Sequence, residues 1–466
     1  AYPAQEKPQW ARGCVGYQIF PDRFRRVDVP GEEAVEPWGS KRVANEYRFG
    51  GNLKGILEAV PYLAELGVGV VYMTPIFLSD TSHRYNTFDY YQIDPLLGSL
   101  EDLKALADAL HERGIRIVLD GVFNHCGLGF APFQDAMEKG KASPYYDWFF
   151  FGEQYPCGYM TFGEKWAYMP KLNMQNEACA EYFLNVGRYW LREAHVDGWR
   201  LDVAADLGHS PEFNHKFWKE FRRVVKEANP EAIILAEHYG DAMSWLQGDE
   251  WDTVMNYDAF MEPVSWFLTG MEKHSDEFNQ GLLGNSESFI GAMTYHMPAF
   301  YAPSLYTAMN ELDNHDHSRF LTRTNHRVGR VANVGPYAAA ENTNKAVLRE
   351  AVVIQMTWPG APTLYYGDEA GQVGFTDPDN RRTYPWGQED QELIRFYKEM
   401  IAVHRRFPVL AMGSLKFLHH DYNVLSYGRF NQEEQVIVVI NNRNERVHVE
   451  LSLIHISEPT RRVVIS

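Results

Sequence analysis

The sequence predicts an α/β fold, a (β/α)8 TIM barrel with a small domain inserted after its third strand and an all-β domain at its C-terminus. Three observations predict it. Eight short apolar runs, most of them ending in polar residues, alternate with amphipathic stretches. A long irregular segment separates the third run from the fourth. After about Phe407 the pattern changes to the alternation of apolar and polar residues that is typical of β-hairpins.

The eight apolar runs are the predicted parallel strands of the barrel. They are residues 15–20, 68–73, 115–119, 198–201, 233–236, 252–255, 308–312 and 362–366. Helical periodicity predicts helices at residues 53–66, where Gly67 ends the helix, and at 100–110, 217–225 and 346–356. The alternative is an open doubly wound sheet. It is disfavoured because no phosphate-binding glycine pattern follows the first run.

These patterns divide the chain into four segments. Residues 1–124 and 174–406 are predicted to form the barrel, and residues 125–173, with Gly and aromatic residues in irregular order, the inserted domain. Residues 407–466 are predicted to form the C-terminal β domain, with strands at 424–427, 435–440 and 447–451.

The end of the chain departs from this pattern. Residues 454–466 interrupt the alternation and look like translated adapter or vector sequence, so we expect that they are not the native ending. The alternative is a divergent native tail. With a non-native ending the sheet is incomplete and exposes an edge. Resequencing the locus checks this, and an uninterrupted native reading frame through these codons would reject it.

Composition and charge exclude several classes of partner. The chain has 466 residues and a formal net charge of −18, which disfavours nucleic acid and anionic membrane surfaces. No apolar window of about 18 residues predicts a membrane-spanning helix. No signal peptide is visible, and a start at Ala1 instead of Met suggests a processed, truncated or engineered N-terminus. We expect a cytoplasmic location, since the four cysteines are too sparse for a disulfide scaffold and lack metal-like spacing.

Two charged residues on the fourth predicted strand carry the strongest chemical signal. Arg200 and Asp202 are two positions apart, so both side chains would project into the barrel mouth. A guanidinium stabilises an ionised carboxylate, which suits a nucleophile. Glu237 ends the next strand, and drier surroundings would raise its pKa and make it a proton donor. Glycosidic bond cleavage requires two such carboxyls. The alternative is a structural ion pair beside a solvated glutamate.

Polar residues at the ends of other predicted strands favour the catalytic alternative. The C-terminal ends of barrel strands surround one mouth, so we expect these residues to converge there. Histidines beside other strand-end polar residues suggest binding of substrate hydroxyls. The residues follow the second, third and seventh strands, and they are His83, Tyr85, Asp120, Asn124, His125, His315 and Asp316.

Several segments resemble the conserved regions of the α-amylase family, in order and with similar spacing. The four main regions are DGVFNH (120–125), GWRLD (198–202), Glu237 and NHD (314–316). Further matches are YQIFPDRF (17–24) and YGDEAG (366–371). The hallmark of the neopullulanase, cyclomaltodextrinase and maltogenic amylase group is similar to MPKLN (169–173). The similarity covers about residues 10–450, and the ordered set is far more specific than any single motif.

The resemblance implies catalytic roles. Asp202 would be the nucleophile that forms a covalent glycosyl-enzyme, and Glu237 the general acid and then the base for water. Asp316 would bind sugar hydroxyls and favour the distorted, oxocarbenium-like state. Arg200 would hold Asp202. This chemistry retains the anomeric configuration and lets another sugar replace water, so transglycosylation is expected to be open to the enzyme.

The resemblance also implies substrate-binding roles. His125 and His315 would hydrogen-bond the sugar at the cleavage subsite, and Tyr85 would stack on it. Tyr239 occupies a place where this group often has Trp, and it would line the leaving-group side.

This sequence departs from the group pattern at several positions. Ala205 and Asp206 stand where members often have Asn-Glu, which leaves the balance between α-1,4 and α-1,6 bonds open. Asn52 stands where Asp is common. No cofactor is expected to be required, and residues 25–33 lack the calcium loop of several relatives. Asn124 matches a calcium ligand of many α-amylases and is the one candidate metal residue.

The resemblance predicts a retaining α-glucan hydrolase that acts on cyclomaltodextrins, pullulan, starch fragments or maltooligosaccharides. One alternative is an isomerase or glucosyltransferase on the same barrel, which residues 169–173 disfavour. Another is a non-catalytic sugar-binding relative, disfavoured because all three carboxylates are present. The expected partner is an α-glucan. The chain begins directly at the barrel, without the N-terminal β-sandwich of many relatives. Whether it forms the dimer of those relatives is therefore left undecided, and a more accessible active-site cleft is expected.

Overall fold

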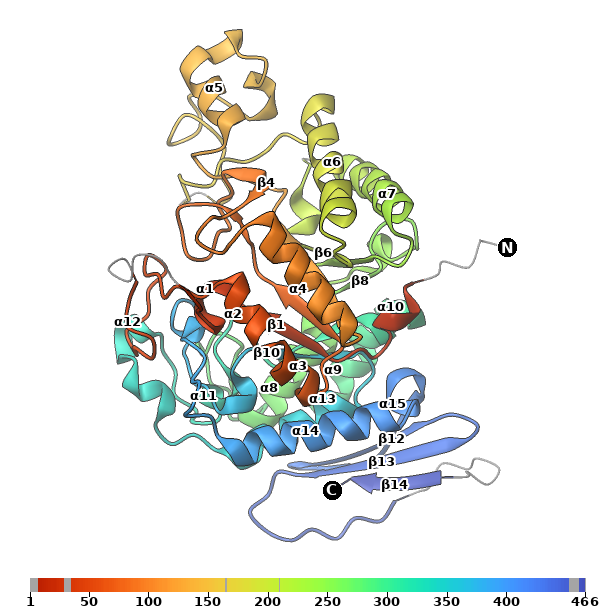
Figure 1. Cartoon of the computed structure of the whole chain (residues 1–466). Helices are drawn as coiled ribbons and strands as arrows, with labels where there is room; N and C mark the ends of the chain where they lie inside the picture. Colours follow the sequence, from red (N-terminus) through yellow and green to blue (C-terminus); the bar gives the residue numbers. More distant parts are fainter. Residues whose placement is uncertain (1–6, 29–34, 164–165, 209, 452–460, 466) are drawn as a thin grey trace.

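A computed structural model describes residues 7–28, 35–163, 166–208 and 210–451, and the backbone of 461–465. Eight parallel strands pair in the order β8-β7-β6-β5-β2-β1-β10-β9, and a bridge between Met255 and Met309 closes them into the predicted barrel (Figure 1). The strands are β1 (Gly16–Ile19), β2 (Val70–Met73), β5 (Arg116–Gly121), β6 (Gly198–Leu201), β7 (Ile233–Ala236), β8 (Thr253–Val254), β9 (Met309–Asn310) and β10 (Ala361–Tyr365).

Helices alternate with the barrel strands, and their apolar faces pack against the sheet in one large core. The predicted helices at 100–110, 217–225 and 346–356 are present and are longer than predicted. The helices are α1 (Pro21–Phe24), α2 (Leu53–Glu58), α3 (Val60–Leu66), α4 (Leu100–Glu112), α5 (Ala131–Lys139), α6 (Glu177–Glu193), α7 (Pro211–Ala228), α8 (Glu262–Thr269), α9 (Ser286–His296), α10 (Ala302–Thr307), α11 (Phe320–Arg323), α12 (Val331–Val334), α13 (Lys345–Thr357), α14 (Gln391–Arg406) and α15 (Val409–Met412). No helix among the described residues is long and apolar enough to cross a membrane.

The single helix predicted at 53–66 is wrong, because the structure divides it into α2 and α3 at Ala59. Pro61 lies in the first turn of α3, where the missing N–H of proline costs no hydrogen bond. In the interior of a continuous helix, Pro61 would remove one backbone hydrogen bond. Gly67 ends α3 as predicted, with a left-handed φ of 97°. Asn52 caps α2, since its side chain accepts a hydrogen bond from the Gly55 N–H.

Two insertions stand at the C-terminal ends of the barrel strands. After β2, the hairpin of β3 (Phe77–Leu78) and β4 (Asp89–Ile93) carries His83 and Tyr85 in its loop. After β5, residues 125–173 form α5, short turns and isolated bridges, including one between His125 and Lys171. Figure 1 shows α5 projecting away from the barrel.

The C-terminal sheet has the order β11-β12-β13-β14, from β11 (Ser414–Asp421), β12 (Val424–Phe430), β13 (Glu434–Asn441) and β14 (Arg461–Ile465). The predicted strand at 447–451 is wrong. Asn441 hydrogen-bonds the backbone of Arg443 and Glu445 in a turn that leads the chain away from β13. Instead β14 pairs in parallel with β13, so that edge is not left open. Residues 454–460 of the segment predicted to be non-native lie outside the described residues.

The barrel register determines which side chains meet at the mouth. Arg200 on β6 pairs in register with Asp120 on β5 and with Leu235 on β7, and Glu237 and Asp202 directly follow β7 and β6. Below them an apolar cluster fills the barrel interior. The charged residues therefore lie directly above a close-packed apolar layer of the barrel interior.

Candidate active site

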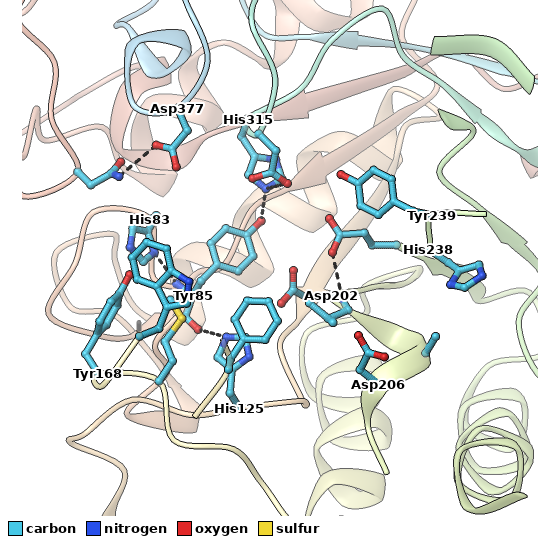
Figure 2. A pocket seen from close by; sticks show the side chains of 18 of the residues that line it. His83, Tyr85, His125, Tyr168, Asp202, Asp206, His238, Tyr239, His315 and Asp377 are labelled. Carbon is cyan, nitrogen blue, oxygen red and sulfur yellow. Dashed lines mark hydrogen bonds and ion pairs between the residues drawn. The ribbon is translucent and has the colours of Figure 1, made fainter. Parts of the chain in front are cut away.

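A cavity of about 600 Å³ opens at the C-terminal ends of the barrel strands (Figure 2). It gathers residues from the segments after β1, β2, β5, β6, β7, β9 and β10. Arg200 is fully buried at its base, in contact with two of the lining carboxyls. Asp120 and Asn124, which were also expected at the mouth, are buried and do not line the cavity. The other eight site residues predicted from the sequence line it, and they are His83, Tyr85, His125, Asp202, Glu237, Tyr239, His315 and Asp316.

One guanidinium joins three carboxyl groups at the base of the cavity. Arg200 donates from Nη1 to Asp120 (3.0 Å to each oxygen) and to Asp202 Oδ1 (3.2 Å), and from Nη2 to Glu237 Oε2 (2.8 Å). The sequence predicted a partner for Asp202 alone, whereas the structure shares Arg200 among three acids. One positive charge facing three carboxyls favours retention of a proton, as a general acid requires.

Burial is the main influence on the two central carboxyls. It raises the pKa of Glu237, where Arg200 opposes the shift and Asp316 adds to it. Burial and the Glu237 carboxyl raise the pKa of Asp202 well above its ordinary value, and Arg200 opposes them. Arg200 thus lowers the pKa of Asp202, as the sequence suggested, but burial and the second acid outweigh it and the net shift is upward.

The residue after Asp202 holds Glu237 in place. Val203 has a left-handed φ of 45°, which is strained for a β-branched side chain. Its N–H donates to Glu237 Oε1 (3.1 Å), and the other carboxyl oxygen is bound by Arg200. Both oxygens of Glu237 are thus oriented by the protein, a role for Val203 that sequence reasoning missed.

Tyr85 and His315 form a hydrogen-bonded chain beside these acids. Their rings are stacked, with centroids 5.3 Å apart. With the Gln18 amide assigned so that Nε2 donates to His315 Nδ1 (2.7 Å), His315 Nε2 donates to the Tyr85 hydroxyl (2.7 Å). The hydroxyl then donates to Asp120 Oδ2 (2.7 Å). Burial lowers the pKa of His315 well below its ordinary value, so the imidazole is neutral. A neutral imidazole has one N–H, which this assignment places on Nε2.

His125 lies on the opposite wall, stacked on Phe162 at 4.7 Å. Its Nε2 donates to the Tyr85 carbonyl (3.0 Å), and Nδ1 faces the Asn124 amide nitrogen (3.2 Å). Burial lowers the pKa of His125 to about 3, so the ring is neutral. Both nitrogens already have protein partners, and a sugar hydroxyl must share or replace one of these bonds.

Asp316 and Tyr239 are the more accessible members of the site. The Asp316 side chain is 35% exposed, and its oxygens lie 3.5 Å from His315 Nε2 and 3.7 Å from Arg381 Nη2, so they can still accept hydroxyl groups. Tyr239 is 46% exposed, and its ring stacks on Tyr257 at 4.2 Å. Tyr239 follows Glu237 by two residues, so its ring stands on the proton-donor side of the cavity.

Sequence reasoning missed several lining residues. Arg381 contacts Asp377 (2.9 Å), Asn45 (2.8 Å) and, at 3.7 Å, Asp316. Its place in the loop after the eighth strand is the signal that could have found it. Phe162, Trp166 and Tyr168 reach the cavity from the inserted segment, where irregular aromatic content was the only signal.

The surroundings of Asn124 do not fit a calcium site, which needs several oxygen ligands, often charged. Asn124 Oδ1 is buried with no hydrogen-bond partner among the described residues, and the adjoining segment carries an ammonium. Lys171 donates to the carbonyls of Leu172 (3.1 Å) and Leu207 (3.0 Å), and the Leu172 N–H donates to the backbone carbonyl of Asn124 (3.0 Å). Across the described part of the chain, no group of three or more His, Cys, Asp or Glu side chains could hold a metal ion.

Comparisons with known proteins agree with this geometry. A family model described as the alpha-amylase catalytic domain matches residues 18–409. Neopullulanase 2 of Thermoactinomyces vulgaris is 41% identical over 462 residues, which is 96% of this chain and 72% of that protein. A cyclomaltodextrinase of Thermoanaerobacter pseudethanolicus is 38% identical, over 94% of this chain and 72% of that protein. Among solved structures, the cyclic alpha-maltosyl-(1→6)-maltose hydrolase of Arthrobacter globiformis has a TM-score of 0.80 at 32% identity, covering 94% of this chain and 92% of that one.

Proposed function

This chain belongs to the α-amylase family of glycoside hydrolases, and we propose that it cleaves α-1,4-glucosidic bonds in α-glucans with retention of configuration. One observation carries the proposal. The Arg200 guanidinium holds Asp202 and Glu237 together in a single cavity, and Asp316 lines the same cavity. Two carboxyls so joined supply the nucleophile and the proton donor of a double displacement.

The proposed reaction has two steps. Asp202 attacks the anomeric carbon while Glu237 gives its proton to the departing glycosidic oxygen, so that a glycosyl-enzyme forms and a free sugar leaves. Glu237, now a carboxylate, takes a proton from water as the water attacks the anomeric carbon and releases Asp202. Asp316 binds ring hydroxyls throughout. A sugar hydroxyl in place of water gives transglycosylation.

The substrates we propose are cyclomaltodextrins, pullulan, starch fragments and maltooligosaccharides. Names of similar proteins support them, since neopullulanase and cyclomaltodextrinase act on such glucans. We propose that α-1,6 bonds are cleaved as well, and isomaltose measures this. Ala205, Asp206 and Tyr239, which differ from the pattern of the group, line the cavity.

Product analysis tests this function. Separate incubations are expected to give short maltooligosaccharides from γ-cyclodextrin and soluble starch, and trisaccharides that keep one α-1,6 bond from pullulan, with the α-anomer appearing first by NMR. Glucose from isomaltose is the expected sign of α-1,6 cleavage. Initial release of the β-anomer would contradict the double displacement. Rearranged disaccharides would instead indicate an isomerase or transferase, and binding without products a non-catalytic relative.

We propose further that activity needs no calcium at Asn124. Burial lowers the pKa of Lys171 to about 8, so at pH 7 its ammonium is mostly charged and repels a divalent cation. Excess EDTA is expected to leave both the hydrolysis rate and the thermal midpoint unchanged. Loss of activity that Ca²⁺, but not Mg²⁺, restores would contradict this.

A further inference from the structure

We propose that a second cavity, on the proton-donor side of the active site, binds the far part of a long α-glucan whose bond is being cleaved. This inference rests on the proposed hydrolysis and adds a binding site to it. The cavity has a volume of about 440 Å³, and we call it the Tyr295 cleft. The residues that matter for the argument are His238, Asp241, Met243, Asp258, Tyr295 and Phe300.

The Tyr295 cleft adjoins the active-site cavity. It is formed by the segments that follow β7 and β8, neighbouring strands of the barrel, and by the end of α9 with the turn after it. His238 lines both cavities, and Figure 2 shows its imidazole turned away from Asp202. Tyr239 lines the first cavity and Tyr257 the second, and their rings stack at 4.2 Å. One aromatic pair is therefore shared between the two cavities.

The position of Glu237 indicates which part of the substrate reaches this cleft. Glu237 protonates the oxygen of the leaving sugar, so the leaving chain begins on the side of His238 and Tyr239. A chain of a few glucose units ends there. A longer chain that continues past His238 enters the Tyr295 cleft, whereas the part of the substrate bound to Asp202 lies on the other side.

The lining suits a neutral carbohydrate. Tyr295 is 80% exposed and Met243 is 38% exposed, so an aromatic face and an apolar side chain are free to pack against sugar rings. Asp241 and Asp258 offer carboxylate oxygens as hydroxyl acceptors, and one oxygen of Asp241 already accepts the Met243 N–H (2.8 Å). No Lys or Arg is among the described residues that line the cleft, which disfavours phosphate-bearing ligands.

Chain-length dependence of a Tyr295→Ala variant tests the proposal. We expect kcat/KM on maltoheptaose and soluble starch to fall about three- to tenfold, the loss of one aromatic contact, through a higher KM. kcat/KM on maltotriose is expected to stay unchanged. Tyr422→Ala is the matched control, because Tyr422 is also an exposed tyrosine (54%) but lies at the β11–β12 turn. It is expected to match the wild type on every substrate.

A direct binding measurement tests the Tyr295 cleft without relying on catalytic turnover. In a Glu237→Gln background, calorimetric affinity for maltoheptaose is expected to fall by a similar factor when Tyr295→Ala is added, and affinity for maltotriose to stay the same. Equal losses on short and long chains, no loss at all, or a changed oligomeric mass of Tyr295→Ala would each overturn the proposal, the last by making this face an interface between copies. A wild type that cleaves no α-glucan would instead reject the proposed function, and this inference with it.

Discussion

Glu237→Gln is expected to lower kcat on maltooligosaccharides about 10²–10⁴-fold, the usual contribution of a general acid. The amide has nearly the same shape, and its oxygen can still accept a hydrogen bond from Arg200 or from the Val203 N–H. What it lacks is the proton for the departing oxygen. Substrate binding and the thermal midpoint are therefore expected to remain close to those of the wild type.

Two measurements separate this loss from a structural one. α-Glucosyl fluoride needs no proton to release its leaving group, so the first step of the variant should recover on that substrate. In the wild type, kcat/KM is expected to fall as the pH rises through the pKa of Glu237, which burial raises, because the acid form is consumed. The pH profile of Glu237→Gln should lack this decrease. Full activity on maltooligosaccharides would reject the assignment of Glu237 as the acid.

Asp202→Ala is expected to cause the larger loss, about 10⁴-fold or more in kcat, on the scale seen when a covalent nucleophile is removed. The alanine leaves no oxygen to attack the anomeric carbon. In contrast to Glu237→Gln, the loss should persist on α-glucosyl fluoride, because a better leaving group does not replace the missing attacking atom.

Intact-protein mass spectrometry provides the decisive comparison for Asp202. In Glu237→Gln the base for the second step is missing, so α-glucosyl fluoride should add one glucosyl unit that persists, and peptide mapping should place it on Asp202. The double variant Asp202→Ala/Glu237→Gln should add none. A glucosyl unit on another residue, or an active Asp202→Ala enzyme, would mean that the nucleophile is elsewhere.

The barrel and its acids could be predicted because they leave regular signals in the chain. Each strand is a short apolar run, since both faces of a parallel sheet are buried, and each ends where the chain emerges at the mouth. Asp202 and Glu237 follow two such runs, so their convergence follows from the topology. The failures came where local patterns compete with distant contacts. The alternation at 447–451 predicted a strand, but β14 pairs with β13 instead.

The sequence by itself determined the barrel, the order of its strands along the chain and which acids stand at their ends, because hydrogen-bonded strands and helices impose short periods on residue type. Only the tertiary structure decided that Arg200 is shared among three carboxyls, that Lys171 holds carbonyls beside Asn124, and that a second cleft adjoins the active site at Tyr295. These features depend on contacts between side chains far apart in the chain. Such contacts have no period, so they become visible only when folding brings the partners together.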